Sequence, residues 1–312
     1  MNREQTEEKI KWIKDTFERK LAYELNLLRV SGPIIVDANS GINDDLGISN
    51  PVTFTSYGQK YQVVQSLAKW KRMRLKDFDV SKFTGIYVDM NAIRPDELVD
   101  ELHSYYVDQW DWEKIISSSN RNLDYLEDIV SIIHKIINSY FDQDHKYPEY
   151  ITFVTTKELE TLYPALSPKE RELIFTQKYK AVFIEQIGLN LSDGQPHDYR
   201  ADDYDDWYLN GDLLYWSDII EAPIEISSMG IRVDANALDR QLHERNTYQL
   251  KKNKEYHKMI LNDELPLTIG GGIGQSRLCM LIMGKRHIGE VQSSVWPQNV
   301  INYCKEHNIE LL

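Results

Sequence analysis

The stretch 222–234 has the hydrophobic pattern of a strand with two different faces, because polar and apolar positions alternate along it with a period of two. One face is predicted to carry Glu225, Ser227 and Met229. Gly230 would allow a bulge, after which the alternation resumes around Arg232. A carboxylate, hydroxyls and an arginine on one strand suit a cation beside an anionic ligand. The alternative is an amphipathic edge strand whose charges are solvated.

The same periods locate the remaining elements. Helices are predicted at 3–28, 68–77, 122–141, 157–162, 168–179, within 235–262 and at 275–283. Strands are predicted at 29–36, 61–67, 85–93, 105–112, 151–155, 181–187 and 213–216. Several strands follow one another without regular strand–helix alternation, which favours an α+β fold built on a mainly antiparallel sheet flanked by helices.

Two polar stretches, 37–60 and 193–206, are predicted to be long loops, and a loop of that length is usually functional or disordered. No linker divides the chain, so residues 1–312 are predicted to form a single domain.

The charge balance argues against a nucleic-acid partner. The chain has 36 Lys and Arg against 49 Asp and Glu, a net charge of −13, which would repel a phosphate backbone. The basic cluster Lys69, Lys71, Arg72, Arg74 and Lys76 could form a local patch, but a solvated helix face is the simpler interpretation.

The cysteine content and the hydropathy indicate a cytoplasmic protein. Only two cysteines occur, which indicates a reducing compartment. No stretch approaches the roughly 20 apolar residues of a membrane span, and the N-terminal residues are too polar for a signal peptide.

Candidate binding groups follow several of the predicted strands. Lys71 and Arg94 could each bind a phosphate or a carboxylate, although a surface role is the simpler interpretation for either one alone. Asp108 and Asp111 flank Gln109, and this set could hold an ammonium and a carboxylate together or form a structural hydrogen-bond network.

Two further motifs are weaker. The acidic run Asp202, Asp203, Asp205 and Asp206 is expected to be mostly solvated, with one member able to face a site. Gly270–Gly274 lacks the third glycine of a dinucleotide fingerprint and the Lys-Ser/Thr of a P-loop, so it is predicted to be a turn that leads into a helix with Arg277 in its first turn. Cys279, inside that apolar helix, is expected to lie in the core.

Longer strings carry a family resemblance. Over essentially its whole length the chain resembles the bacterial asparagine synthetase A family, the ammonia-dependent aspartate–ammonia ligases, whose fold is that of class II aminoacyl-tRNA synthetase catalytic domains. The matching strings occur in family order; they are SLAKWKR at 66–72, RPDE at 94–97, YVDQWDWE at 106–113, LSDG at 191–194, YDDW at 204–207, LNGD at 209–212, SSMGIRVD at 227–234 and IGGGIGQSR at 269–277.

The resemblance implies a two-step reaction. The β-carboxylate of L-aspartate attacks ATP to give β-aspartyl-adenylate and pyrophosphate, and ammonia then attacks the acyl carbon to release asparagine and AMP. It also implies a requirement for Mg²⁺ and a homodimer, and a single catalytic domain over residues 1–312 without an appended tRNA-binding or glutaminase domain. A carboxylate near the acyl carbon could bind ammonium and accept its proton.

The resemblance further implies roles for individual residues. Arg94 would hold the α-phosphate and Arg277 the triphosphate and adenine side, with Gly272 also at the ATP site. Asp212 and Glu225 would hold Mg²⁺. The aspartate pocket would comprise Ser66, Lys71, Gln109, Asp111, Ser227, Ser228 and Arg232, closed by Asp44 and Asp205. Asp44, Asp111 and Asp205 remain alternatives for the group that meets the substrate ammonium or the incoming ammonia.

Three alternative functions are less consistent with the sequence. Glutamine-dependent synthesis commonly uses an N-terminal cysteine, whereas this sequence begins Met1-Asn2. A tRNA-charging enzyme would need an additional binding module and a less acidic chain. A non-catalytic regulator would be expected to lack the charged residues that are present here.

Overall fold

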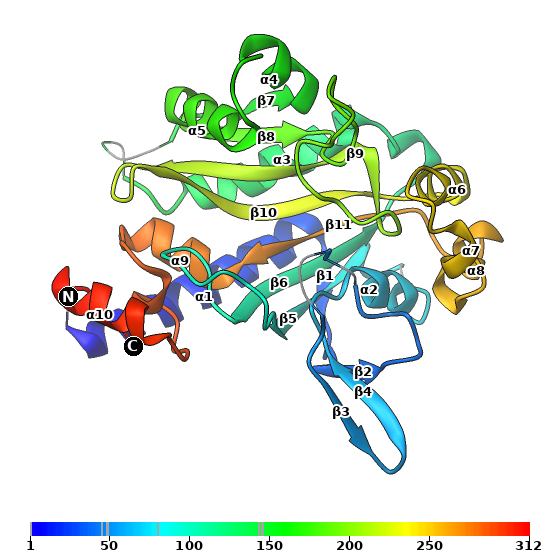
Figure 1. Ribbon diagram of the computed structural model, residues 1–312, viewed down its shortest axis with the longest axis horizontal. Coiled ribbons are helices and arrows are strands. Elements are labelled where there is room, and N and C mark those ends of the chain that lie inside the picture. Colours follow the sequence, from blue (N-terminus) through cyan, green and yellow to red (C-terminus); the bar gives the residue numbers. More distant parts are fainter. Residues whose placement is uncertain (1, 45, 48–49, 80, 143, 145–146) are drawn as a thin grey trace.

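The central feature of the fold is one eight-stranded sheet. The structure is a computed structural model that describes residues 2–44, 46–47, 50–79, 81–142, 144 and 147–312. In spatial order the strands are β1 Leu27–Arg29, β5 Gly85–Ile93, β6 Tyr106–Ile115, β11 Thr268–Gly274, β10 Ala222–Arg232, β9 Asp205–Ser217, β8 Ala181–Glu185 and β7 Thr152–Thr155 (Figure 1). The two outermost pairs are parallel and the inner pairs antiparallel. The sheet is therefore mostly antiparallel, as expected, with parallel edges.

The helices flank the sheet and form several layers of packing around it (Figure 1). They are α1 Arg3–Leu25, α2 Ala68–Leu75, α3 Leu123–Asn138, α4 Thr156–Leu162, α5 Pro168–Tyr179, α6 Ala235–Glu244, α7 Tyr248–Lys251, α8 Glu255–Leu261, α9 Gln275–Met283 and α10 Gln298–Glu306, with 3₁₀ turns η1 Ser118–Asn120 and η2 Ile288–Glu290. None of the described helices is long and apolar enough to cross a membrane.

The main core lies where α1 and α3 cover one face of the sheet. The helix predicted at 122–141 buries the apolar positions Leu126, Ile129, Ile133 and Ile137, which the period of 3.6 placed on one face. They pack against sheet residues such as Trp112. Each fully buried side chain of this size contributes about 1.5–3 kcal/mol, so this face fixes the sheet on the helices.

The predicted loop at 37–60 is only partly correct. Strands β2 Ile35–Asp37, β4 Gln59–Val63 and β3 Thr53–Ser56 form a separate three-stranded sheet, and residues 45, 48 and 49 lie outside the described part. The β3–β4 hairpin turns at Tyr57-Gly58, where both residues have positive φ, as a two-residue hairpin turn requires. A non-glycine first position concealed this signal in the sequence.

The prediction that Gly270–Gly274 forms a turn is wrong. These residues belong to β11, which pairs with β10 on one side and β6 on the other. Ile269 and Ile273 are fully buried and supply the apolar pattern of one face. Glycine is depleted in strands, and this low propensity concealed the strand. The helix predicted to follow begins directly at Gln275, and Cys279 is buried in it as expected.

At the opposite side of the sheet from β1, two carboxyl groups lie close together, and one of them has a raised pKa. Glu185, at the end of β8, is buried and lies beside Glu127 of α3. Burial, together with the negative charges of Glu127 and Glu158, raises the pKa of Glu185 to about 8. At neutral pH its carboxyl is therefore protonated and donates a hydrogen bond to Glu127.

We expect this pair to make stability depend on pH. In the native state Glu185 keeps its proton up to a pH of about 8, whereas in the unfolded state it loses the proton near its ordinary pKa of 4.5. The free energy of unfolding therefore falls as the pH rises from 4.5 to about 8, and it levels off at higher pH. The Glu185→Gln variant keeps a neutral donor. It should match the wild type near pH 5 and exceed its Tm at pH 9 by at least about 2 °C.

The measurement is thermal unfolding at both pH values, with Glu306→Gln on the exposed face of α10 as the matched control. The control should show no pH-dependent difference from wild type. A Glu185→Gln gain of equal size at pH 5 and pH 9 would contradict the raised pKa of Glu185.

Candidate active site

A cleft of about 340 Å³ lies over the face of the sheet that α1 and α3 do not cover. Its floor is a row of directly paired residues on neighbouring strands, in which Asp212 of β9 faces Ser228 of β10, which faces Gly272 of β11, which faces Asp111 of β6. All four line the cleft. Because paired residues project to the same side of a sheet, strands far apart in the sequence converge on one surface.

A bulge in β10 determines which side chains reach this surface. The register shifts between Glu225 and Ser227, so two residues of β10 oppose one of β9. The extra residue changes the alternation and puts Glu225 on the same face as Ser228. The prediction that Glu225, Ser227 and Met229 share one face is therefore wrong. Ser227 instead donates a hydrogen bond to the Gly272 carbonyl at 2.9 Å and does not line the cleft, and Met229 lies in the core.

The glycines of β11 make room for side chains of the site. A Cβ at Gly270 would lie 2.0 Å from Glu113 Oε2 and 2.6 Å from Arg232 Nη2, and a Cβ at Gly272 would lie 2.4 Å from Gln109 Oε1. The close approach expected of this motif is thus present, and the groups that approach are side chains of β6 and β10. Any larger residue at these positions would displace them.

Asp111 combines a buried ion pair with an open oxygen. Its Oδ1 accepts from Lys71 Nζ, which also donates to the carbonyls of Trp112 at 3.0 Å and Gly271 at 3.2 Å. Among the described residues no donor reaches Oδ2 of Asp111, although that atom is buried and the residue lines the cleft. An unpaired buried carboxylate oxygen is costly, so this atom has strong affinity for a cationic donor.

Lys71 itself does not line the cleft. It is fully buried behind Asp111, with three acceptors around its ammonium group. The arrangement does not support the predicted direct contact between Lys71 and a substrate carboxylate, because the ammonium group already has as many acceptors as it has protons.

Arg232 is held between two carboxylates at the inner end of the cleft. Glu113, fully buried, accepts from its Nε at 3.0 Å and its Nη2 at 2.8 Å, and Asp205 accepts from its Nη1. Thr268 donates to Glu113 at 2.7 Å. Burial opposes the charged form of Arg232, but Glu113 and Asp205 more than compensate and raise its pKa well above the ordinary value. Arg232 is therefore a fixed positive charge in the cleft wall.

Arg200 links Ser228 of β10 to Asp212 of β9 on the floor of the cleft. Its Nη1 donates to Ser228 Oγ, and its Nη2 donates to Asp212 Oδ1 at 2.6 Å. Arg200 lines the cleft and is only 8% exposed. Sequence reasoning missed it, because it lies in the polar stretch predicted to be a loop.

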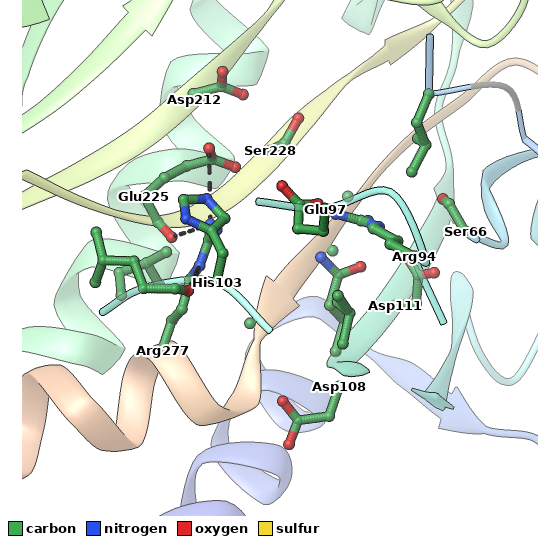
Figure 2. A pocket seen from close by; sticks show the side chains of 18 of the residues that line it. Ser66, Arg94, Glu97, His103, Asp108, Asp111, Asp212, Glu225, Ser228 and Arg277 are labelled. Atoms are coloured by element: carbon green, nitrogen blue, oxygen red, sulfur yellow. Dashed lines mark hydrogen bonds and ion pairs between the residues drawn. The ribbon is translucent and has the colours of Figure 1, made fainter. Parts of the chain in front are cut away.

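Two further arginines line the cleft, Arg94 and Arg277, and each has few partners within the described part of the protein. Nη2 of Arg94 reaches only the Gln65 carbonyl, at 3.4 Å, and in the part of the chain that the structure describes its Nε has no acceptor. Arg277 donates to the Glu225 carbonyl at 3.1 Å and lies 3.8 Å from its carboxylate (Figure 2). Burial lowers the pKa of Arg94; the negative charge of Glu97 opposes this shift, and repulsion from Arg277 adds to it. Both arginines can accept a polyanion between them.

Asp44 lies outside the cleft. Its carboxylate accepts from the backbone N–H of Ala68 at 2.6 Å and of Lys69 at 3.3 Å, at the N-terminal end of α2. It is 1% exposed and is not among the residues that line the cleft, whereas Ser66 is. Gln109 and Asp205 also line it. The structure therefore brings together all the predicted site residues except Asp44, Lys71 and Ser227, which lie directly behind it.

The two predictions of solvated charge are correct only for Arg74 and Lys76, which are exposed. Asp202, Asp203, Asp205 and Asp206 are all buried, as are Lys69, Lys71 and Arg72 of α2. The two groups pair with oppositely charged side chains and with carbonyls, which is how buried charges are stabilised. The burial of these charges was not predictable from the sequence, because their oppositely charged partners lie far away along the chain.

Glu113 was also missed as a functional residue. It lies within the string YVDQWDWE, two residues after Asp111, so the alternation of a strand places both carboxylates on one face. That spacing was the signal in the sequence that could have identified it.

Asp108 is held by partners within the protein, Lys14 at 2.8 Å and Ser276. These contacts favour the hydrogen-bond network over the direct-binding alternative for Asp108.

The comparisons with known proteins agree over the whole chain. Residues 4–308 match the aspartate-ammonia ligase family. The aspartate–ammonia ligase of Malacoplasma penetrans is 49% identical, covering 99% of this chain and 98% of that protein. The enzyme of the same name from Fusobacterium nucleatum is 51% identical, covering 99% of this chain and 97% of that protein.

Solved structures share the fold at much lower identity. Asparaginyl-tRNA synthetase of Entamoeba histolytica in complex with asparaginyl-adenylate has a TM-score of 0.64 at 13% identity, covering 93% of this chain and 66% of that one. The enzyme of the same name from Pyrococcus horikoshii, also with asparaginyl-adenylate, has a TM-score of 0.63 at 13% identity, covering 94% and 70%. This chain thus spans about two thirds of those proteins and shares their catalytic fold. With full-length relatives near 50% identity and a family match over 4–308, the chain belongs to the aspartate–ammonia ligase family.

Proposed function

We propose that the cleft makes L-asparagine from L-aspartate, ATP and ammonia through a β-aspartyl-adenylate, and that the residues assembled there divide into a nucleotide side and an aspartate side. The observation that carries this division is the set of charged groups on the nucleotide side: Arg277 contacts Glu225, Asp212 projects from the neighbouring strand, and Arg94 has few internal partners (Figure 2). Magnesium-bound triphosphate needs such a pairing of cationic and anionic groups.

On the nucleotide side the arginines hold phosphate oxygens. The planar fork of Arg94 can hold the α-phosphate through two N–H groups, and Arg277 can hold the distal phosphates. Neutralising charge on the α-phosphate and pyrophosphate lowers the barrier to attack by the aspartate β-carboxylate. Gly272, on the floor between the two sides, leaves space for the reacting groups.

Asp212 and Glu225 fit a Mg²⁺ ion that is shared with the triphosphate. They project from neighbouring strands onto the same face. Burial raises the pKa of Asp212, the positive charge of Arg200 opposes this rise, and the negative charge of Glu225 adds to it. The two carboxylates therefore repel one another, and a cation between them would relieve that repulsion. Among the described residues no group of three or more His, Cys, Asp or Glu could hold a metal alone. Mg²⁺ prefers one or two carboxylates with phosphate oxygens and water, and it would neutralise the phosphates and orient them.

On the aspartate side the open oxygen of Asp111 receives the substrate α-ammonium group. Gln109, Ser66 and Ser228 can hydrogen-bond the carboxylates, while Arg232 supplies a fixed positive charge. Lys71 acts through Asp111, which it holds in place. This arrangement positions the β-carboxylate toward the nucleotide side, and positioning is the main contribution such a site makes.

The proposal is tested first by product analysis. Purified protein with ATP, Mg²⁺ and aspartate should form asparagine and equimolar AMP when ammonium is supplied, but not when glutamine is supplied instead. Formation of ADP would reject the adenylate route. Aspartate-dependent pyrophosphate exchange without asparagine formation would indicate another acceptor, for which tRNA would be tested.

Asp111→Asn is expected to weaken aspartate binding selectively. It removes the charge that receives the α-ammonium group, and losing a charged hydrogen bond costs about 1.5–3 kcal/mol, or roughly 10- to 100-fold. The KM for aspartate should rise by that factor while the KM for ATP changes little. The control is Asp128→Asn on the exposed side of α3. Equal rises in both KM values would contradict the assignment.

Asp205 is the favoured proton acceptor for the amidation step. It lines the cleft, whereas Asp44 does not, and the proposed contact with the α-ammonium group occupies Asp111. Burial raises the pKa of Asp205 against the opposing charges of Arg232 and Arg200, which suits a group that takes a proton from ammonium.

Asp205→Asn should therefore slow asparagine formation at least about 10-fold more than aspartate-dependent pyrophosphate exchange, since general-base catalysis contributes about 10²–10⁴. The measurement compares the two half-reactions at saturating ammonium on the same preparation. If both rates fall by the same factor, Asp205 serves the site as a whole and the assignment fails.

The family resemblance also supports a homodimer. In α1, Trp12 is 48% exposed and Tyr23 is 83% exposed, and Ile34 before β2 is 60% exposed. Exposed large apolar side chains on the N-terminal helix and before β2 are consistent with a contact between two copies. Light scattering of the purified protein would distinguish a dimer from a monomer.

A further inference from the structure

The cleft wall formed by residues 198–205 is anchored from behind by buried carboxylates. Asp198, Tyr199, Arg200, Tyr204 and Asp205 all line the cleft. The two acidic residues in the middle of this segment, 202 and 203, do not line it and are 4% and 1% exposed. The segment thus presents one set of side chains to the ligand and another to the protein interior.

Asp203 lies among three nitrogen donors from different elements. Its Oδ2 is 3.4 Å from Lys69 Nζ of α2, 3.2 Å from Lys251 Nζ of α7 and 3.0 Å from His257 Nε2 of α8. Burial opposes its ionisation, but Lys69, His257 and Lys251 hold the pKa of Asp203 well below the ordinary value. Its charge is therefore permanent at neutral pH.

Asp202 makes the second attachment. Its two carboxylate oxygens accept from Lys251 Nζ and from Thr247 Oγ1, and Gln241 donates to its backbone carbonyl at 3.2 Å. Lys251 therefore contacts both carboxylates. Its side chain is 13% exposed and it belongs to α7, whose residues do not line the cleft.

The same network reaches α2. Lys69 Nζ, besides its contact with Asp203, lies 3.9 Å from Asp44 Oδ1, and Asp44 in turn accepts from the first N–H groups of α2. Figure 1 shows α7 and α8 at the edge of the molecule, next to α2. Lys69 is the point at which the segment 198–205, α2 and the loop that carries Asp44 meet.

We propose that Asp203 and Lys251 are positioning residues, which fix the segment 198–205 from the α7–α8 side so that Arg200 and Asp205 are held at the aspartate side of the cleft. This rests on the proposed division of the cleft into two sides. Arg94 and Arg277 come from outside the segment, on the β5–β6 connection and α9, and contact none of these groups. Arg200 also donates to Asp212, so loosening the segment should reach the nucleotide side to a lesser extent, and it should affect aspartate more than ATP because the nucleotide arginines stay in place.

The test uses three substitutions at or near the network. Lys251→Met removes the charge that joins both carboxylates, Lys251→Arg keeps a charge there, and Lys258→Met removes a charge from the exposed side of α8. KM values for aspartate and ATP, and kcat, are measured by pyrophosphate exchange at a temperature well below the Tm of each variant. Asp203→Asn is a second disruption of the same network.

Lys251→Met is expected to raise the KM for aspartate about 10-fold and the KM for ATP less than about 3-fold, since small misplacements of binding groups have effects of this order. Lys251→Arg should restore most of the aspartate affinity, and Lys258→Met should match wild type. Unchanged aspartate KM in folded Lys251→Met, or parallel rises for both substrates, would overturn the proposal. A wild-type protein that shows no aspartate-dependent exchange would instead refute the proposed function itself.

Discussion

The balance of buried charge is the constraint on which the cleft depends. The guanidinium of Arg232 is enclosed in the sheet, and it can remain there only because Glu113 and Asp205 take up its N–H groups from two other strands. Removing one member would leave an uncompensated charge in a medium of low polarity. Three strands are thereby held in one register by a single side chain, and the floor of the cleft acquires a fixed positive charge.

This constraint also decides the sequence of β11. The pair between Arg232 and Glu113 occupies the space above Gly270, where a Cβ would lie 2.0 Å from a carboxylate oxygen. Glycine weakens a strand, and its cost in a strand interior is of the order of 1 kcal/mol. Pairing on both edges and the burial of Ile269 and Ile273 offset that cost. A motif that looks like a phosphate loop is thus explained by the side chains of its neighbours.

The helices and strands could largely be predicted from the sequence, whereas the charge pairs between residues far apart in the chain could not. The apolar period of α3 and the alternation of β5 are local properties, so the helix and the strand were predictable from the residues alone. The bulge that puts Glu225 and Ser228 on one face depends on the pairing with β9, which no local pattern records. The side-chain partners of the acidic run at 202–206 lie 27 residues or more away in the sequence, as in the contacts of Asp205 with Arg232 and of Asp203 with His257. The burial of this run therefore could not be read from composition, and neither could the role of Arg200.

The groups proposed to bind ligand combine two features: they line the cleft, and some of their hydrogen-bonding partners are missing within the described part of the protein. Lys71 and Glu113 are buried with their hydrogen-bonding capacity filled from within the protein. Asp111 keeps one buried oxygen without a donor, and Arg94 keeps one N–H without an acceptor, in the described part of the chain. A free amino acid with one ammonium group and two carboxylates supplies the missing charges. Because each unpaired buried group costs about 1–3 kcal/mol, the same deficits that destabilise the free cleft provide the free energy for selecting a ligand whose charges match.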